Sequence, residues 1–199
     1  GDVILVTSGT PTAPVTYTGD LFINKNITIR STGGPEATII DTDRTNEAAY
    51  FPAAVLFWGE DADGALEGFT IQCPGYNGVY VNGGSPVVRN NIVSGCNGGM
   101  GAALAGANPA FENNLLVNNR GKAIDVWLGS ARILNNTVYG NDVGISVCNA
   151  AAPEITNNIV AENTIGVQDE LGLHECTGAP TMPVIRYNDV WGNGENYHG

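Results

Sequence analysis

Residues 86–95 of the chain read PVVRNNIVSG, and variants of this phrase return four more times before the sequence ends. The later copies are PAFENNLLVN at 109–118, ARILNNTVYG at 131–140, PEITNNIVAE at 153–162 and PVIRYNDVWG at 183–192. A marker Asn holds the same place in each copy, at Asn91, Asn114, Asn136, Asn158 and Asn188, giving intervals of 23, 22, 22 and 30 residues. A nearly constant period of this length predicts a stacked array of short repeats, because each unit buries its apolar face only against its neighbours.

Apolar residues recur at fixed places around each marker. One column lies three residues before it, at Val88, Phe111, Ile133, Ile155 and Ile185, and another two residues after it, at Val93, Leu116, Val138, Val160 and Val190. Before each phrase comes a further apolar pair: Val79 and Val81, Ala102 and Leu104, Ile124 and Val126, Ile145 and Val147. Alternation with polar or small residues is typical of strands with one face inward. Three such strands in about 22 residues form one coil of a β-solenoid.

Several segments carry a family resemblance. GVYVNG at 78–83, GISVCN at 144–149 and LEGFTIQ at 66–72 resemble repeats of the pectin-lyase-like superfamily, as do the openings DVILVTSGT at 2–10 and NITIRSTGGPEATIID at 26–41. The resemblance implies an all-β fold, a right-handed single-stranded parallel β-helix, and right-handed crossovers are the rule for parallel strands. The resemblance does not identify the function, because proteins with this fold include lyases, hydrolases, adhesins and inert spacers.

The whole chain, 1–199, is expected to form one such domain. Residues 1–65 predict less regular N-terminal coils, and residues 66–199 predict regular ones. Val167 and Ile185 are 18 residues apart where Val79 and Val88 are 9 apart, so residues near 170–182 are expected to leave the coil as an inserted loop.

Composition and charge exclude some classes of partner. The formal net charge of −12 argues against binding to nucleic acid or to an anionic membrane surface. No apolar run is long enough to span a bilayer, and no signal peptide is visible, so any targeting segment is expected to have been removed.

The four cysteines predict two disulfides. Cys73 and Cys96 are separated by about one coil, which brings them within disulfide reach in a stack. Cys148 ends a strand, and Cys176 lies in the inserted loop, which could fold back onto it. The alternative of a four-cysteine metal site lacks the close CxxC spacing that such sites use. Two disulfides indicate an oxidising compartment, so the protein is expected to be secreted or on the extracellular surface.

The Asn columns are interpreted as structural. Asn tolerates the left-handed bend between two strands, and stacked side-chain amides can hydrogen-bond from coil to coil. A second column five residues further along is interpreted in the same way: Asn119, Asn141, Asn163 and Asn193.

The outward side of one strand per coil holds the candidate binding site. Across the coils this side is expected to present Tyr80, Ala103, Asp125, Ser146 and Gln168, beside Asn82, Ala105, Trp127, Cys148 and Glu170. Aromatic rings with carboxylates suit sugars, and the resemblance places active sites of the family's enzymes on this sheet. The candidate ligand contacts are Tyr80, Asp125, Trp127, Glu170 and, from the insertion, His174. The alternative is an ordinary exposed sheet whose Trp127 is covered by the inserted loop.

The sequence contains no complete set of catalytic residues. Asp125 and Glu170 are the only candidate catalytic pair, and at two coils apart they would be separated by about 9.6 Å along the stack, marginal for an inverting glycosidase. We therefore expect a non-catalytic domain that binds a polysaccharide or cell-surface glycan, or has a structural or adhesive role. The alternative is a small polysaccharide lyase or glycoside hydrolase acting on an extracellular polysaccharide.

Two further expectations concern metals and partners. Glu60, Asp61 and Asp63 in the acidic turn GEDADG at 59–64 are candidate Ca²⁺ ligands, although acidic turns are also common on solvated surfaces. No other cofactor is predicted. Open solenoid ends favour end-to-end self-association or an adjoining domain, with Tyr187, Trp191 and Tyr197 helping to close the C-terminal end.

Overall fold

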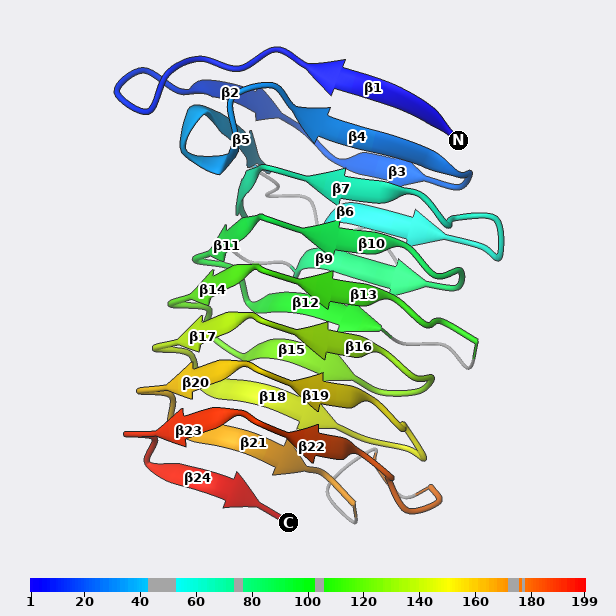
Figure 1. The fold of residues 1–199 in the computed structure, drawn as a ribbon, viewed down its shortest axis with the longest axis vertical. Coiled ribbons are helices and arrows are strands. Elements are labelled where there is room, and N and C mark those ends of the chain that lie inside the picture. The colour runs from blue at the N-terminus through cyan, green and yellow to red at the C-terminus, as the bar shows by residue number, and fades with distance from the viewer. Residues whose placement is uncertain (43–52, 74–76, 103–105, 172–175, 177) are drawn as a thin grey trace.

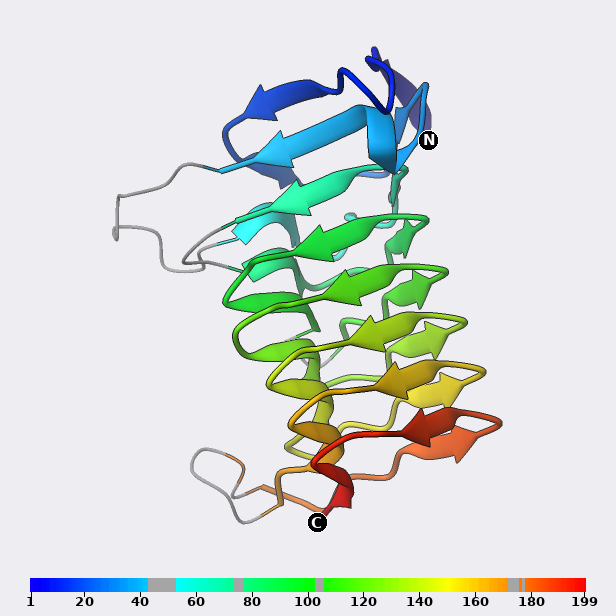
Figure 2. The same cartoon turned by 90° about the vertical axis from the view of Figure 1, so that its left-hand side faces the viewer.

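The computed structural model describes residues 1–42, 53–73, 77–102, 106–171, 176 and 178–199. In these residues the chain winds as a column of coils with the two termini at opposite ends (Figure 1). The coils stack in sequence order, and the turned view shows their strands lying on different sides of the column (Figure 2).

Each coil contributes one strand to each of three parallel sheets. The first sheet contains β1 (Asp2–Val6), β4 (Ile27–Ser31), β7 (Ala65–Glu67), β10 (Val87–Arg89), β13 (Ala110–Glu112), β16 (Arg132–Leu134), β19 (Glu154–Thr156) and β22 (Val184–Arg186). The second contains β2 (Val15–Thr18), β5 (Thr38–Asp41), β8 (Thr70–Gln72), β11 (Ile92–Ser94), β14 (Leu115–Val117), β17 (Thr137–Tyr139), β20 (Ile159–Ala161) and β23 (Asp189–Trp191). The third contains β3 (Leu21–Ile23), β6 (Ala53–Trp58), β9 (Asn77–Asn82), β12 (Gly98–Ala102), β15 (Lys122–Val126), β18 (Val143–Val147), β21 (Ile165–Asp169) and β24 (Glu195–His198). A 3₁₀ turn, η1 (Pro35–Ala37), precedes β5. The predicted parallel β-helix is confirmed.

The apolar columns fill the interior in the predicted register. Val88 pairs with Phe111, which is followed in the same row by Ile133, Ile155 and Ile185. The second-sheet column from Val93 to Val190 is aligned in the same way. The side chains of Phe111, Ile133 and Leu116 are fully buried, because the coil above and the coil below both cover them. The strands of residues 1–65 join the same three sheets.

One strand of the third sheet is shifted by two residues from the predicted register. Met100, rather than Ala102, pairs with Val79 on one side and Ile124 on the other, and its side chain is 2% exposed. The long methionine side chain fills the interior column, where an alanine would leave a void. The inward-facing positions of β12 therefore lie two residues earlier in the sequence than predicted. The outward position next to Tyr80 belongs to Gly101 and not to Ala103. Ala103, Leu104 and Ala105 lie outside the described residues.

The marker asparagines form a buried hydrogen-bonded ladder. From Asn114 onwards, the Oδ1 atom of each one accepts from the backbone N–H and the Nδ2 of its counterpart one coil earlier, as Asn136 does from Asn114 at 3.0 Å for both. Its own Nδ2 donates to a main-chain carbonyl, that of Phe111 at 2.8 Å in the case of Asn136. The predicted coil-to-coil amide stacking is confirmed for this column and for the second one.

The left-handed bend, however, is not at the marker. Positive φ angles occur one residue earlier, at Asn90, Asn113, Asn135, Asn157 and Tyr187. In the second column the bend is likewise at the preceding residue, which is Asn118, Gly140, Glu162 or Gly192. The second residue of each pair needs its amide for the ladder, and the first one takes the strained conformation. The expectation that the marker Asn supplies the bend is therefore wrong.

Both predicted disulfides are present. Cys73–Cys96 joins neighbouring coils with a Cα–Cα distance of 4.7 Å, and Cys148–Cys176 ties the inserted segment to the end of β18 at 5.5 Å. The backbone N–H of Cys96 donates to Oδ1 of Asn119 at 3.1 Å, so the first disulfide lies directly at the end of the second Asn ladder.

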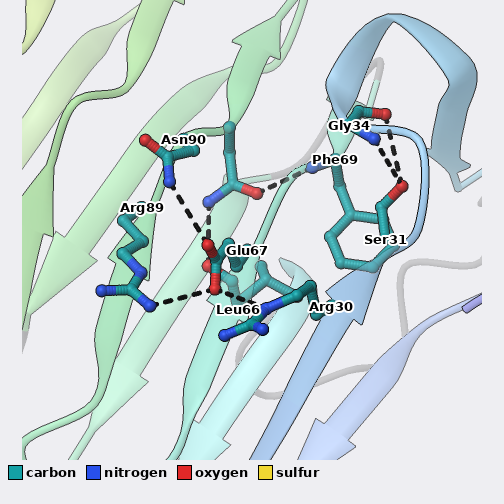
Figure 3. A network of polar contacts seen from close by, with 9 residues as sticks. Arg30, Ser31, Gly34, Leu66, Glu67, Phe69, Arg89 and Asn90 are labelled. Atoms are coloured by element: carbon teal, nitrogen blue, oxygen red, sulfur yellow. Dashed lines mark hydrogen bonds and ion pairs between the residues drawn. The ribbon is translucent and has the colours of Figure 1, made fainter. Parts of the chain in front are cut away.

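An ion-pair cluster crosses three coils on the outside of the first sheet. Glu67 accepts from Arg30 at 2.8 Å and from Arg89 at 3.1 Å, and Nδ2 of Asn90 lies 3.4 Å from its other oxygen (Figure 3). Burial alone would raise the pKa of Glu67, but the two guanidinium groups outweigh it and hold that pKa below its ordinary value of 4.5. Arg89 thus pairs with the preceding coil, while Arg132 lies between Glu112 and Glu154.

Glu67→Gln should lower the unfolding free energy by about 1 kcal/mol at neutral pH, because both arginines are partly exposed and the pairs are screened. A carboxyl whose pKa is lowered by folding stabilises above its unfolded pKa, and this contribution is lost as the pH falls through the folded pKa. The difference between wild type and Glu67→Gln should therefore be full above pH 4.5 and vanish in stronger acid. Urea unfolding at a series of pH values measures it, and a pH-independent difference would contradict the assignment.

The largest exposed apolar side chains lie mainly in the first and last described coils. Val3, Leu5 and Phe22 are 56%, 63% and 59% exposed at one end. Tyr187, Trp191 and Tyr197 are 83%, 50% and 54% exposed at the other. No helix among the described residues is long and apolar enough to cross a membrane.

Candidate functional site

The outer face of the third sheet brings the predicted polar column together. Strand pairing places Tyr80, Gly101, Asp125, Ser146 and Gln168 in one row across five consecutive coils. Tyr80, Asp125 and Ser146 each lie between two buried apolar residues of a short strand, so the alternation that builds the core also turns this row away from it.

A hollow of about 330 Å³ opens at the Tyr80 end of this row. It is lined by Asn77, Tyr80, Asn97, Gly98, Met100, Gly101, Gly121, Lys122 and Asp125. Gly101 lies between Tyr80 and Asp125 in the row and has no side chain to fill the space between them. A Cβ atom there would already be 3.4 Å from the Tyr80 ring. We call this space the Tyr80 hollow.

Lys122 is the centre of the charges at the hollow. Its ammonium group is 2.7 Å from Oε1 of Glu170 and 3.4 Å from both carboxylate oxygens of Asp125. The same Oε1 accepts a hydrogen bond from Oγ of Ser146 at 2.9 Å. Lys122 is therefore held by Glu170 and shares only a long contact with Asp125.

Three pKa values at the site are shifted upward. Burial raises the pKa of Asp125, and Glu170 adds to this, so together they outweigh the attraction of Lys122. Burial would lower the pKa of Lys122, but the two carboxylates reverse this and raise it. Burial and then the charge of Asp125 raise the pKa of Tyr80, so the phenol keeps its proton. The hollow thus presents a neutral hydroxyl beside a carboxyl that takes up a proton more readily than usual.

Comparison with protein-family models agrees with this architecture. A family model described as "Right handed beta helix region" matches residues 53–197. The chain belongs to this right-handed β-helix family. A search of the solved structures finds the Azotobacter vinelandii mannuronan C-5 epimerase AlgE4 A-module, at 10% identity and a TM-score of 0.39, covering 98% of this chain and 88% of that one. A search of curated proteins returns no match.

The right-handed β-helix brings only part of the predicted site together. Tyr80 and Asp125 line the hollow, and Glu170 reaches Asp125 through Lys122. Trp127 is partly buried and does not line this hollow. His174 lies outside the described residues.

Glu170 is placed differently from Asp125. Its side chain is 13% exposed, its Oε1 is occupied by Lys122 and Ser146, and its Oε2 is 3.1 Å from Sγ of Cys176. Among the described residues, Cys148, Glu170 and Cys176 are the one group of three potential metal ligands within reach of one another. Both sulfur atoms are tied up in the disulfide, so they are not available as thiolates. The Ca²⁺ candidates Glu60, Asp61 and Asp63 do not form such a group.

Sequence reasoning missed Lys122 as a site residue and missed the contributions of Asn77, Asn97 and Met100. Lys122 begins β15 two positions before the inward-facing Ile124, so strict alternation would place its side chain inside and does not reveal it at the site. Its contact with Glu170 could not be read from the sequence either, because that contact depends on where the chain turns two coils later.

Proposed function

We propose that the protein is an extracellular, non-catalytic β-helix that binds an uncharged part of a glycan in the Tyr80 hollow. The main support for this proposal is the composition of the hollow. It offers an aromatic ring, a shared Lys122–Asp125 pair and the side chains of Asn77 and Asn97 around a space of about 330 Å³. Rings and paired polar groups of this kind suit the apolar faces and hydroxyls of a sugar.

The net charge of the cluster selects against acidic sugars. Lys122 carries one positive charge between two carboxylates, so no cation in the cluster is left to hold a uronate. The whole chain is also strongly acidic, at −12. Long-range repulsion would slow the approach of a polyuronate. A neutral glycan is therefore the proposed ligand, and the two disulfides support an oxidising, extracellular location.

A polysaccharide-cleaving enzyme is the second candidate, and the raised pKa of Asp125 favours it, since a general acid needs such a carboxyl. A hydrolase of the usual kind also needs a second carboxylate that is free to act as base or nucleophile. Glu170 is committed to Lys122 and Ser146, which argues against a role as that partner.

Tyr80→Ala should weaken retention on a neutral-glycan affinity gel by about tenfold, because a stacked ring contributes on the order of 1 kcal/mol or more. Asp125→Asn should weaken it less, since the amide keeps the shape and the hydrogen-bonding capacity. Asp142→Asn, on an exposed turn outside the hollow, is the matched control and should leave retention unchanged. Equal retention by wild type and Tyr80→Ala would refute binding in this hollow.

The same samples distinguish binding from catalysis. Incubation with neutral glycans, pectate and alginate, followed by detection of new reducing ends and of unsaturated products, should give no product. Product formed by wild type and lost in Asp125→Asn would establish the enzymatic alternative.

A further inference from the structure

A second hollow lies at the edge of the third sheet, where β6 and β9 end. It encloses about 450 Å³ and is lined by Trp58, Gly59, Glu60, Asp63, Asn82, Gly83, Gly84, Ser85 and Gly106. The lining of the Tyr80 hollow contains none of these residues. We call it the Trp58 hollow.

The floor of the Trp58 hollow is built from two stacked turns that leave no room for side chains. A Cβ atom at Gly84 would lie 2.8 Å from the carbonyl oxygen of Ala62, and one at Gly83 would be 3.1 Å from the main chain of Gly59. Both glycines have positive φ angles, 105° and 70° for Gly83 and Gly84. The N–H of Ser85 donates to Oδ1 of Asp63 at 2.7 Å and ties the turns together. The hollow is thus a fixed feature of two consecutive coils.

Asn82 is the lining residue of this hollow that has an unsatisfied buried polar atom. Its side chain is 4% exposed, and its Oδ1 atom is buried with no hydrogen-bond partner among the described residues. A buried acceptor without a partner costs on the order of 1–3 kcal/mol. The asparagines of the two ladders, by contrast, have their Oδ1 atoms satisfied by the preceding coil. A donor brought by a ligand would remove the cost at Asn82.

The remaining groups define what kind of donor fits. Trp58 is 39% exposed at the rim and offers an aromatic face. Glu60 and Asp63 add two carboxylates, and no Lys or Arg is among the residues that line the hollow. The hollow is therefore rich in acceptors beside an indole ring, a combination that suits a pyranose whose hydroxyls or protonated amine donate while its C–H face stacks.

We propose that the Trp58 hollow is a second glycan subsite that binds a donor-rich pyranose, prefers an amino sugar over a neutral one, and rejects uronates. It rests on the proposed function for the class of ligand but does not depend on the Tyr80 hollow. Trp58 stacks on the ring, Oδ1 of Asn82 accepts from a hydroxyl, and Glu60 faces the amine.

Amide-resolved NMR titration with three probes tests this subsite: a β-1,4-linked glucosamine tetramer, cellotetraose and tetragalacturonate. The amides of Gly59, Gly83 and Gly84 should shift with the first two probes and not with the third. Trp58→Ala should weaken binding of the glucosamine tetramer at this site about tenfold. Glu60→Gln should reduce the preference for the amino sugar over cellotetraose while leaving cellotetraose binding unchanged.

Trp191→Ala is the matched control, because Trp191 is a half-exposed tryptophan on β23, outside the lining of this hollow. It should bind all three probes as the wild type does. Unchanged binding in Trp58→Ala, tightest binding of tetragalacturonate, or the same amide shifts on adding Ca²⁺ alone with none on adding sugar would each overturn the subsite. Tyr80→Ala separates the two proposals: it should abolish shifts at Gly98 and Gly101 and leave those at Gly83 and Gly84.

Discussion

Asn136→Ala should lower the free energy of unfolding by about 4 kcal/mol, the largest effect we expect from a single substitution. The side chain of Asn136 is 1% exposed and makes four hydrogen bonds. Its Oδ1 accepts from the backbone N–H and Nδ2 of Asn114, and its Nδ2 donates to the Phe111 carbonyl and to Oδ1 of Asn158. Alanine would remove all four and leave buried partners on the coils above and below without compensation.

Asn135→Gly is the control, because it changes the neighbouring residue in the same turn. Asn135 has a φ of 56°, a left-handed conformation that glycine adopts at no steric cost, and it is exposed. This variant should differ from wild type by less than about 1 kcal/mol. Urea unfolding followed by circular dichroism compares the three proteins. A cost for Asn135→Gly equal to that for Asn136→Ala would show that the turn conformation, and not the ladder, stabilises this corner.

The Asn ladder shows which features of the fold could be predicted from the sequence and which could not. The repeat predicted the two Asn columns and their stacking, because five copies of one pattern average out local ambiguity. It misplaced the bend because four of the five copies read Asn-Asn, as at Asn90 and Asn91. The informative pairs were the exceptions: Tyr187 precedes the marker Asn188, and Gly140 precedes Asn141 of the second column, so only the second residue of each pair is constant. An invariant amide points to hydrogen bonding, and a variable neighbour points to backbone conformation.

Removing the disulfide between neighbouring coils, as Cys73→Ala with Cys96→Ala, should cost about 3 kcal/mol. The bridge closes a loop of 23 residues, and the loss of that cross-link lets the unfolded chain gain entropy. Both sulfur atoms also belong to fully buried residues, so part of the apolar core is lost as well. The melting temperature measured under oxidising conditions should fall accordingly.

Reductant provides the internal control for this variant. Wild type in reductant should lose the contributions of both bridges, whereas the double variant in reductant should lose only that of Cys148–Cys176. In reductant the double variant should therefore melt below wild type only by the contribution of the two buried sulfur atoms, a smaller gap than under oxidising conditions. A double variant as stable as wild type under oxidising conditions would show that the stacked core makes the bridge energetically redundant.

Three features could not be predicted because the local sequence patterns are ambiguous or the contacts are distant in the sequence. The stretch around Met100 reads NGGMGAALAGAN, and its small residues satisfy the alternation in two registers that differ by two residues. Only the volume of the core distinguishes them. Trp58 lies in the part of the chain where strands could not be assigned to coils. Its pairing with Asn82 in the next coil could therefore not be predicted. The contact between Lys122 and Glu170 likewise spans 48 positions of sequence.

The ladder gives the stack a polarity. Along the marker column, each Nδ2 from Asn91 to Asn158 donates to Oδ1 of the marker in the next coil, so the amide-to-amide bonds all run in one direction along the solenoid axis. Phe69 stands at one end of the column, where its N–H donates to Asn91, and Asn188 stands at the other. The two ends are therefore chemically unlike, as in a polar filament. A coil inserted, duplicated or borrowed from a related solenoid would fit in one orientation only, which makes the 22-residue unit a directional building block.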